Sequence, residues 1–308
     1  MNLRIWVFGF CAILALASRA LVAGSAADGK TWPNYPGAAT TPTHLEFADL
    51  PGFTRSTVKR NYALITPESR VFQKNPLLDS GVTSHLISPA MGANFAMYYA
   101  RLQPKGRLTN PKDATIERFV ICLDGGVDVE MRAKDEIALT GKTTRASIRV
   151  GEFGYMPANA SHAIVSDASE STLLVFEREY TIRDVNPDYR FGAIDDQDVL
   201  PVAPEVFTLR KLMPDTPDYD FNIHVMDFRP GEHLHVKEVH YNQHGLLLVA
   251  GRGIYRLGDD WYPVTAGDVI WMAPYVPQWY AALGSETSRY ILYKDTTVDP
   301  VLGRYELP

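Results

Sequence analysis

Cysteine, basic charge and helical periodicity are all scarce in this 308-residue sequence, and each scarcity excludes a class of protein. Only 2 residues are Cys, so a fold held together by a disulfide framework is excluded. The formal net charge is −6 and no basic cluster is present, which argues against nucleic acid or an anionic membrane as a partner. No long stretch repeats apolar residues with the 3.6-residue period of an amphipathic helix, so a helical bundle is not expected.

The N-terminus is predicted to be a secretory signal peptide covering residues 1–27. Arg4 supplies the positive n-region, residues 5–17 are continuously apolar or small, and small residues that suit cleavage follow. The apolar run falls short of the ~20 residues that span a bilayer, so a cleaved signal is preferred to an anchor. Cleavage would remove Cys11 and leave Cys122, for which a buried, inert thiol is expected. Entry into the secretory pathway without a disulfide suggests the endoplasmic reticulum or another luminal compartment as readily as the exterior, and the lumen of the endoplasmic reticulum is the predicted location.

Short apolar runs bounded by Gly, Pro, Asn and Asp are what the sequence has in abundance. Their length, and their enrichment in β-branched and aromatic residues, favour strands over helices. The clearest runs are residues 94–102, 119–123, 172–176, 245–249, 269–272 and 289–293. The fold class is therefore predicted to be all-β.

The chain also repeats itself. Residues 151–162 align with 267–278, and each block begins with Gly and places an aromatic–Met pair at the same offset. Matching blocks lie before and after them in the same order, which indicates two similar β-domains in tandem. The predicted division is an N-terminal barrel at 45–183, an Asp- and Pro-rich linker at 184–204, and a C-terminal barrel at 205–308.

The densest chemical signal lies between Glu238 and His244. On a continuous strand, Glu238 and His240 project to the same face because side chains alternate, and His244 has the same parity. The strand that follows the turn at 267–268 would supply a fourth donor, Gln278. These four residues are predicted to form one divalent-metal site in the C-terminal barrel.

The donor set limits the metal. It contains a carboxylate oxygen, two imidazole nitrogens and an amide oxygen, which suits Mn²⁺ or Fe²⁺ better than a tetrahedral structural Zn²⁺. Unrelated polar residues on a solvated strand are the alternative interpretation. The histidines interpreted in that way are His44, His85, His162, His224 and His233. His235 is placed outside the metal shell because its parity differs from that of Glu238 and His240.

The segment from Glu238 to Gly251 resembles the first cupin motif, with two departures. Glu238 stands where that motif has its first His, and His244 stands where it has its Glu. Gln278 likewise replaces the His of the second cupin motif. This rearranged set resembles the bicupin (S)-ureidoglycine aminohydrolases of purine catabolism. The similarity covers residues 50–55, 63–69, 219–224 and nearly all of 236–293.

The resemblance implies a bicupin fold, that is, two tandem cupin barrels of the jelly-roll (double-stranded β-helix) type, assembled into a homo-oligomer. It also implies an enzyme that releases ammonia hydrolytically from the Cα of (S)-ureidoglycine to give (S)-ureidoglycolate, with Mn²⁺ as the cofactor. Three residues fall opposite Glu238, His240 and His244 in the other barrel, and none matches a ligand: Lys112, Ala114 and Arg118. The N-terminal barrel is therefore expected to lack the metal.

The resemblance also assigns roles around the metal. Glu238, Gln278, Tyr290 and Lys294 would contact the substrate, and Lys294 and Tyr255 would be catalytic. Lys294 is interpreted either as a proton shuttle with a lowered pKa or as an anchor for the substrate carboxylate. For both tyrosines the alternative is core packing with the hydroxyl at the rim.

Two other functions compete with this one. A dioxygenase or a germin-like oxidase would use another metal-cupin chemistry, but those sites typically have three His and a Glu, so Gln278 argues against them. A storage or sugar-binding bicupin would use the tandem architecture without catalysis. An intact, inward-facing ligand set argues against that interpretation.

Overall fold

The computed structural model describes residues 52–132, 143–182, 185, 187–219 and 221–295, so the predicted signal peptide at 1–27 lies outside these ranges. The regular secondary structure of the described residues is nearly all strand, as predicted, with two short 3-10 helices, η1 (Pro67–Ser69) and η2 (Pro89–Met91). No helix in the described ranges is both long and apolar enough to cross a membrane.

The described residues form nineteen strands. Those of the first half are β1 (Thr57–Val58), β2 (Tyr62–Ile65), β3 (Leu78–Ile87), β4 (Ala96–Thr109), β5 (Ile116–Asp124), β6 (Gly126–Arg132), β7 (Thr143–Arg149), β8 (Glu152–Met156), β9 (Ser161–Ser166), β10 (Ser171–Glu179) and β11 (Arg190–Ala193). Those of the second half are β12 (Thr208–Lys211), β13 (Phe221–Phe228), β14 (His244–Ala250), β15 (Arg252–Leu257), β16 (Asp260–Thr265), β17 (Val269–Met272), β18 (Gln278–Ala282) and β19 (Ser288–Asp295).

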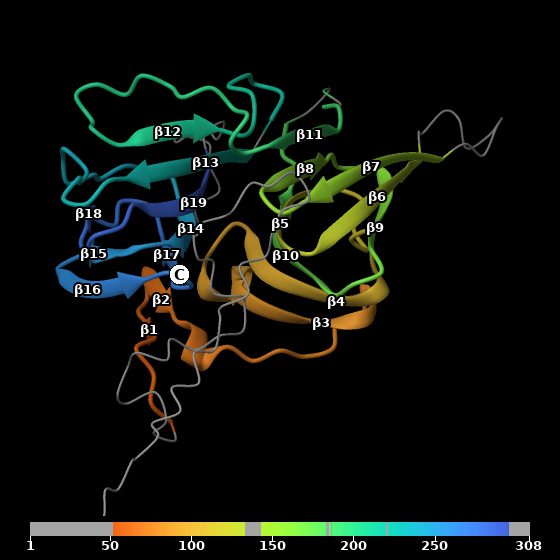
Figure 1. Ribbon diagram of the computed structural model, residues 1–308, viewed down its shortest axis with the longest axis horizontal. Helices are drawn as coiled ribbons and strands as arrows, with labels where there is room; N and C mark the ends of the chain where they lie inside the picture. Colours follow the sequence, from red (N-terminus) through yellow and green to blue (C-terminus); the bar gives the residue numbers. More distant parts are fainter. Residues whose placement is uncertain (1–51, 133–142, 183–184, 186, 220, 296–308) are drawn as a thin grey trace, which may run out of the picture.

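Two groups of strands lie side by side (Figure 1). The N-terminal barrel is the sheet with the order β11-β8-β5-β10-β4-β9-β6-β7, to which β3 is added by pairing with β4. The C-terminal barrel consists of a sheet with the order β1-β2-β17-β14-β19-β13-β12 and a smaller sheet, β16-β15-β18. The prediction of an all-β fold of two tandem jelly-roll barrels is confirmed.

The repeat found in the sequence reappears in the pairing of the strands. β5 lies between β8 and β10 in one barrel, and β14 lies between β17 and β19 in the other. The register is equivalent as well, since Arg118 pairs with Glu177 and His244 pairs with Lys294. Arg118 and His244 therefore occupy equivalent positions in the two barrels.

The strand pairing differs from the predicted domain boundaries in two places. β1 and β2, assigned to the N-terminal barrel at 45–183, extend the C-terminal sheet, where β2 pairs with β17 (orange beside blue in Figure 1). β11 falls inside the predicted linker at 184–204 but pairs with β8. Contacts remote in sequence explain both shifts: Arg55 donates two 2.8 Å hydrogen bonds to Asp268, and Phe191 packs against Gly154.

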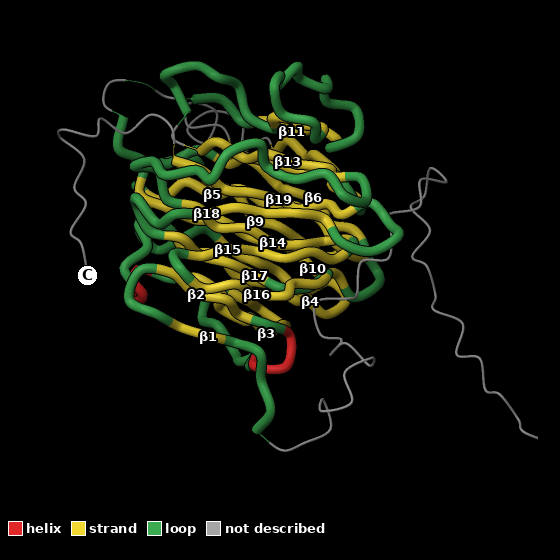
Figure 2. The backbone as a smooth tube through the Cα atoms, turned by 90° about the vertical axis from the view of Figure 1, so that its left-hand side faces the viewer, coloured by secondary structure: helices red, strands yellow, loops and turns green. Residues whose placement is uncertain are grey.

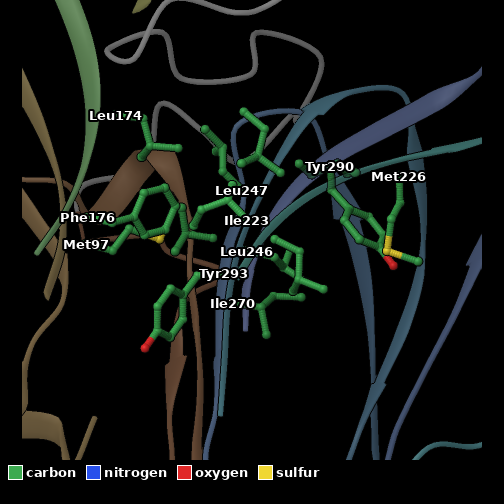
Figure 3. Close-up of a cluster of buried hydrophobic side chains, with 14 of the residues drawn as sticks. Met97, Leu174, Phe176, Ile223, Met226, Leu246, Leu247, Ile270, Tyr290 and Tyr293 are labelled. Atoms are coloured by element: carbon green, nitrogen blue, oxygen red, sulfur yellow. The ribbon is translucent and has the colours of Figure 1, made fainter. Parts of the chain in front are cut away.

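The two barrels share one apolar core, formed where β4, β5 and β10 face β13, β14 and β19. Phe176 stacks on Tyr293 with ring centroids 6.1 Å apart, and Phe119 lies 6.3 Å from Phe221. Figure 3 shows Phe176 and Tyr293 in this cluster together with Met97. Figure 2, seen from the side of the C-terminal barrel, shows the strands of both barrels running in broadly the same direction. One face of the C-terminal sheet is thus used for packing, and the other lines the interior of its own barrel.

The interior of the N-terminal barrel contains a buried ion pair at the position equivalent to His244. Arg118 is fully buried, and its Nη2 lies 2.6 Å from Oε1 of Glu177. Its Nη1 lies 3.0 Å from Nε2 of His162, and the hydroxyl of Tyr98 donates a 3.0 Å hydrogen bond to Glu177. Since a buried charge must be paired and hydrogen-bonded, this cluster accounts for polar residues inside an otherwise apolar barrel.

This cluster predicts a pH dependence of stability. Burial, and then the charge of Arg118, lower the pKa of His162 to about 3. The unfolded chain takes up this proton near pH 6.5, so acidification below that pH destabilises the folded state until the pH falls through about 3. We expect His162→Gln, which keeps an acceptor for Arg118, to reduce the loss of unfolding free energy by about 1.4 kcal/mol per pH unit. Urea titrations at pH 7 and pH 5 measure this difference, and identical pH slopes for both proteins would contradict it.

A second prediction concerns the close contact between the barrels at Gly245 in β14. A Cβ added there would lie 2.5 Å from the ring of Phe95, which is itself packed on Tyr293 with ring centroids 4.0 Å apart. We expect Gly245→Ala to lower the free energy of unfolding by about 1–3 kcal/mol, because the ring cannot move away without disturbing its neighbour. In a Phe95→Ala background the same substitution should be nearly neutral. An equal cost in both backgrounds, measured by urea unfolding, would rule out this explanation.

Candidate metal centre

The four predicted ligands come from three separate pieces of the C-terminal barrel. Glu238 forms an isolated bridge with Gln278, the first residue of β18, through backbone hydrogen bonds of 2.9 and 3.0 Å. His244 is the first residue of β14. His240 lies between them, and its carbonyl oxygen accepts a 2.7 Å hydrogen bond from the backbone of Tyr275. All four lie at the end of the barrel where β14 and β18 begin.

The prediction that residues 238–244 lie on one continuous strand is wrong. Residues 238–244 do not form one continuous strand, because the chain bends at Tyr241 and regular pairing starts only at His244. Strand alternation therefore does not explain why Glu238, His240 and His244 share a face. They meet because the bridge to Gln278 and the start of β14 bring both ends of the segment to the same place.

The side-chain amide of Gln278 is the point at which the other three side chains meet. Its Nε2 lies 3.2 Å from Oε2 of Glu238, 3.1 Å from Nε2 of His240 and 3.0 Å from Nδ1 of His244. The imidazole rings of His240 and His244 have centroids 4.7 Å apart, and Nε2 of His240 lies 3.7 Å from Oε2 of Glu238. One carboxylate, two imidazoles and one amide thus surround a common centre.

The residues present suit a divalent cation. Nδ1 of His244 lies within 3.1 Å of both amide atoms of Gln278, but hydrogen bonds among these side chains leave Nδ1 of His240 and Nε2 of His244 buried without a partner in the described part of the chain. A cation among them would accept a lone pair from each, with the amide oxygen turned inward, and oxygen and nitrogen donors of this kind suit Mn²⁺ or Fe²⁺. In the described part of the chain no three His, Cys, Asp or Glu side chains form such a group by themselves. Gln278 is therefore the member that joins the set.

The centre is buried on one side and open on the other. Gln278 and His244 are each 3% exposed, whereas the side chains of Glu238 and His240 are 33% and 23% exposed. Burial, and then the neighbouring His240 and Lys294, hold the pKa of His244 well below its usual value. A neutral imidazole keeps its lone pair, as a metal ligand requires. A small molecule would reach the centre from the side of Glu238 and His240.

The three other predicted site residues line the same interior. The hydroxyl of Tyr255 donates a 3.3 Å hydrogen bond to Oε1 of Gln278. Tyr290 is 2% exposed, and burial raises its pKa well above the usual value. Lys294 pairs with His244 across β14 and β19. Burial lowers the pKa of Lys294, and the charges of Glu238 and Asp295 only partly oppose this. The lowered pKa agrees with the prediction, and burial is its main cause.

His224 is a residue of this interior that the sequence interpretation missed. It lies on β13, two positions along from Asn222, the partner of Lys294, and its Nε2 is buried without a hydrogen-bond partner in the described part of the chain. Burial, and then Lys294, lower its pKa to about 3. The similarity of residues 219–224 to the family does not indicate a role for His224. The position of His224 beside Lys294 depends on strand register. His235, in contrast, is exposed, and its backbone donates to Glu205 outside the centre.

Comparisons with known proteins identify the relatives of this chain. A model of the cupin domain matches residues 224–293. A protein of Oryza sativa subsp. japonica named probable (S)-ureidoglycine aminohydrolase is 51% identical over 262 residues, which are 85% of this chain and 81% of that protein. The (S)-ureidoglycine aminohydrolase of Arabidopsis thaliana is 47% identical over 298 residues, 95% and 93% of the two chains. The crystal structure of a putative glyoxylate-induced protein from Pseudomonas aeruginosa superposes with a TM-score of 0.72 at 20% identity, covering 88% and 98%, which shows the shared fold alone.

Proposed function

The chain belongs to the (S)-ureidoglycine aminohydrolase family of enzymes, and from this membership we propose that it releases ammonia from (S)-ureidoglycine and leaves (S)-ureidoglycolate. The observation that carries the proposal is the convergence of Glu238, His240 and His244 on the side chain of Gln278. The set differs from the three His and one Glu typical of oxidative cupins, and it lies at an opening of a buried interior.

We further propose that Glu238, His240, His244 and Gln278 hold a divalent metal, with Mn²⁺ as the cofactor. The donor set and the neutral state of His244 support this assignment. When bound, such an ion would orient a small α-amino carboxylate and supply positive charge beside it. Because Glu238 is the most exposed of the four, it is also the ligand best placed to contact the substrate amine.

The chain's own side chains supply the remaining chemistry. Loss of an amine from a carbon atom needs a proton delivered to the nitrogen and a water molecule placed at the carbon. Lys294 is the candidate for the proton transfer, because a lowered pKa makes its ammonium a better acid near neutral pH. Tyr255 holds the amide of Gln278 through its hydroxyl, and Tyr290 closes the apolar side of the interior. A closed interior excludes bulk water, so that only a positioned water molecule reaches the carbon.

Ammonia release from freshly generated ureidoglycine tests the proposed reaction. We expect the purified protein to release one ammonia per substrate and to form one enantiomer of ureidoglycolate, because one face of the substrate is fixed against Glu238 and Gln278. Oxygen consumption is recorded in the same assay. Oxygen uptake without ammonia would favour a dioxygenase or germin-like oxidase, and neither signal would favour a storage bicupin.

Location and assembly remain proposals. We propose that residues 1–27 direct the protein into the lumen of the endoplasmic reticulum and that the mature chain forms a homo-oligomer. Expression of the full chain with a C-terminal fluorescent fusion, followed by N-terminal sequencing of the mature protein, tests the first. Sedimentation equilibrium tests the second, and a monomer at micromolar concentration would contradict it.

A further inference from the structure

We propose that Asp295 is a positioning residue for the proposed reaction, held by Asn94 of the N-terminal barrel, and that it fixes the segment carrying His240 and His244. The inference rests on the proposed function for its kinetic consequence only. It gives the N-terminal barrel, which holds none of the proposed ligands, a part in the chemistry of the other barrel.

Asp295 ends β19 and is fully buried. Its Oδ1 accepts a 2.7 Å hydrogen bond from the backbone nitrogen of Gln243, directly before His244. Its Oδ2 accepts a 2.9 Å hydrogen bond from Nδ2 of Asn94, and its carbonyl oxygen accepts one from the side chain of Asn242. One residue thus binds two consecutive residues of the segment and one residue of the other barrel.

The side chain of Gln243 adds a second connection between the same parts. Gln243 is 3% exposed, and its Oε1 accepts hydrogen bonds from the backbone of Asn94 at 3.2 Å and from Nε1 of Trp271 at 3.4 Å. Asn94 therefore contacts both Asp295 and Gln243. The bend that carries His240 is held at its C-terminal end by residues from both barrels.

The physical chemistry of a buried carboxylate makes this connection stiff. A buried charge is tolerated only while hydrogen bonds satisfy it, and hydrogen bonds to ionised groups are about twice as strong as neutral ones. Movement of Gln243 away from Asp295 would leave the carboxylate unsatisfied. Since residues 238–243 lie outside regular strands, these side-chain bonds take the place of a strand ladder in fixing His240 and His244. Residues that support ligands in this way typically change metal affinity or activity about 10–100-fold when replaced.

Swapping the side chains at positions 94 and 295 tests the proposal. In Asp295→Asn the charge is lost, so the bond from Gln243 becomes a weaker neutral one, and the new NH₂ group faces the NH₂ group of Asn94, whose amide must turn over to accept from it. In Asn94→Asp two carboxylates face each other. In the double variant the amide at position 295 donates to the carboxylate at position 94 and still accepts from Gln243, so both hydrogen bonds are restored.

Two quantities are measured for each full-length variant. Amide hydrogen exchange of residues 238–246 is measured without added metal and with Mn²⁺, and kcat for ammonia release is measured with ureidoglycine in the presence of Mn²⁺. We expect each single variant to exchange faster in this segment and to lose kcat about 10–100-fold, and the double variant to recover most of both. The matched control is Tyr98→Phe, which removes a 3.0 Å hydrogen bond to Glu177 inside the N-terminal barrel. It should lower Tm without changing either readout.

Two results would overturn the proposal. One is unchanged exchange of residues 238–246 in Asp295→Asn, and the other is a double variant no better than the single ones. Faster exchange with unaltered kcat would also overturn it, since the segment would then be mobile without consequence for the reaction. If the wild-type protein releases no ammonia, the proposed function fails, while the exchange comparison still decides whether Asp295 fixes the segment.

Discussion

Glu238→Ala is expected to lower kcat/KM for ammonia release at least about a thousandfold. The substitution removes one of the four proposed metal ligands and the carboxylate nearest the opening of the site. A bound metal contributes several kcal/mol of charge stabilisation in the transition state, and each 1.4 kcal/mol is worth about tenfold in rate. The metal content of the purified variant should fall in parallel, because three remaining ligands include only two strong nitrogen donors.

A second variant at Glu238 separates its charge from its role as an oxygen donor, and a variant at Glu205 serves as a control. Glu238→Gln keeps an oxygen donor and removes the charge, so it should retain part of the metal and little activity. Glu205→Ala removes a carboxylate that accepts from the backbone of His235 outside the centre, and it should leave metal content unchanged. Metal analysis combined with the ammonia assay measures all three. Full metal occupancy together with wild-type kcat/KM in Glu238→Ala would contradict the assignment of the site.

Lys294→Met is expected to lower kcat by about 10²–10⁴-fold, the range for a lost general acid or base. Lys294 lies beside His244 on the neighbouring strand, and burial lowers its pKa, so its ammonium gives up a proton more readily than that of an exposed lysine. Methionine keeps the length and apolar character of the side chain, which limits the effect on packing. Stopped-time ammonia assays over a range of substrate concentrations measure kcat and KM separately.

The change in KM decides between the two roles considered for Lys294. A large rise in KM with kcat nearly unchanged would contradict proton transfer and indicate an anchor for the substrate carboxylate. Lys59→Met is the control, because Lys59 is an exposed residue in the turn between β1 and β2. It should change neither constant by more than about twofold.

The sequence predicted the strands well because each buried strand is a short apolar run, and the repeat located the equivalent strands of the two barrels. It could not predict that β1 and β2 join the C-terminal sheet, since that depends on contacts such as Arg55 with Asp268 across 213 positions. The same holds for β11, whose residues appear as a polar linker until Phe191 is seen against Gly154.

The candidate site was predicted for a partly wrong reason. The four residues do converge, but through a bridge and a bend and not through alternation along one strand. Residue type and spacing identified Glu238, His240 and His244, because few chemistries place two histidines and a carboxylate so close together. His224 and Asp295 could not be found in this way. Their positions beside Lys294 and Gln243 depend on strand register and on hydrogen bonds to residues far away in the sequence.

We propose that this enzyme depends on one divalent ion held by Glu238, His240, His244 and Gln278. Titration of the metal-depleted protein with Mn²⁺, with ammonia release from ureidoglycine measured at each step, tests this dependence. We predict negligible release at the start and a linear rise that ends at one equivalent of Mn²⁺ per chain. Full release by the metal-depleted protein, or no release at any concentration of Mn²⁺, would contradict the claim.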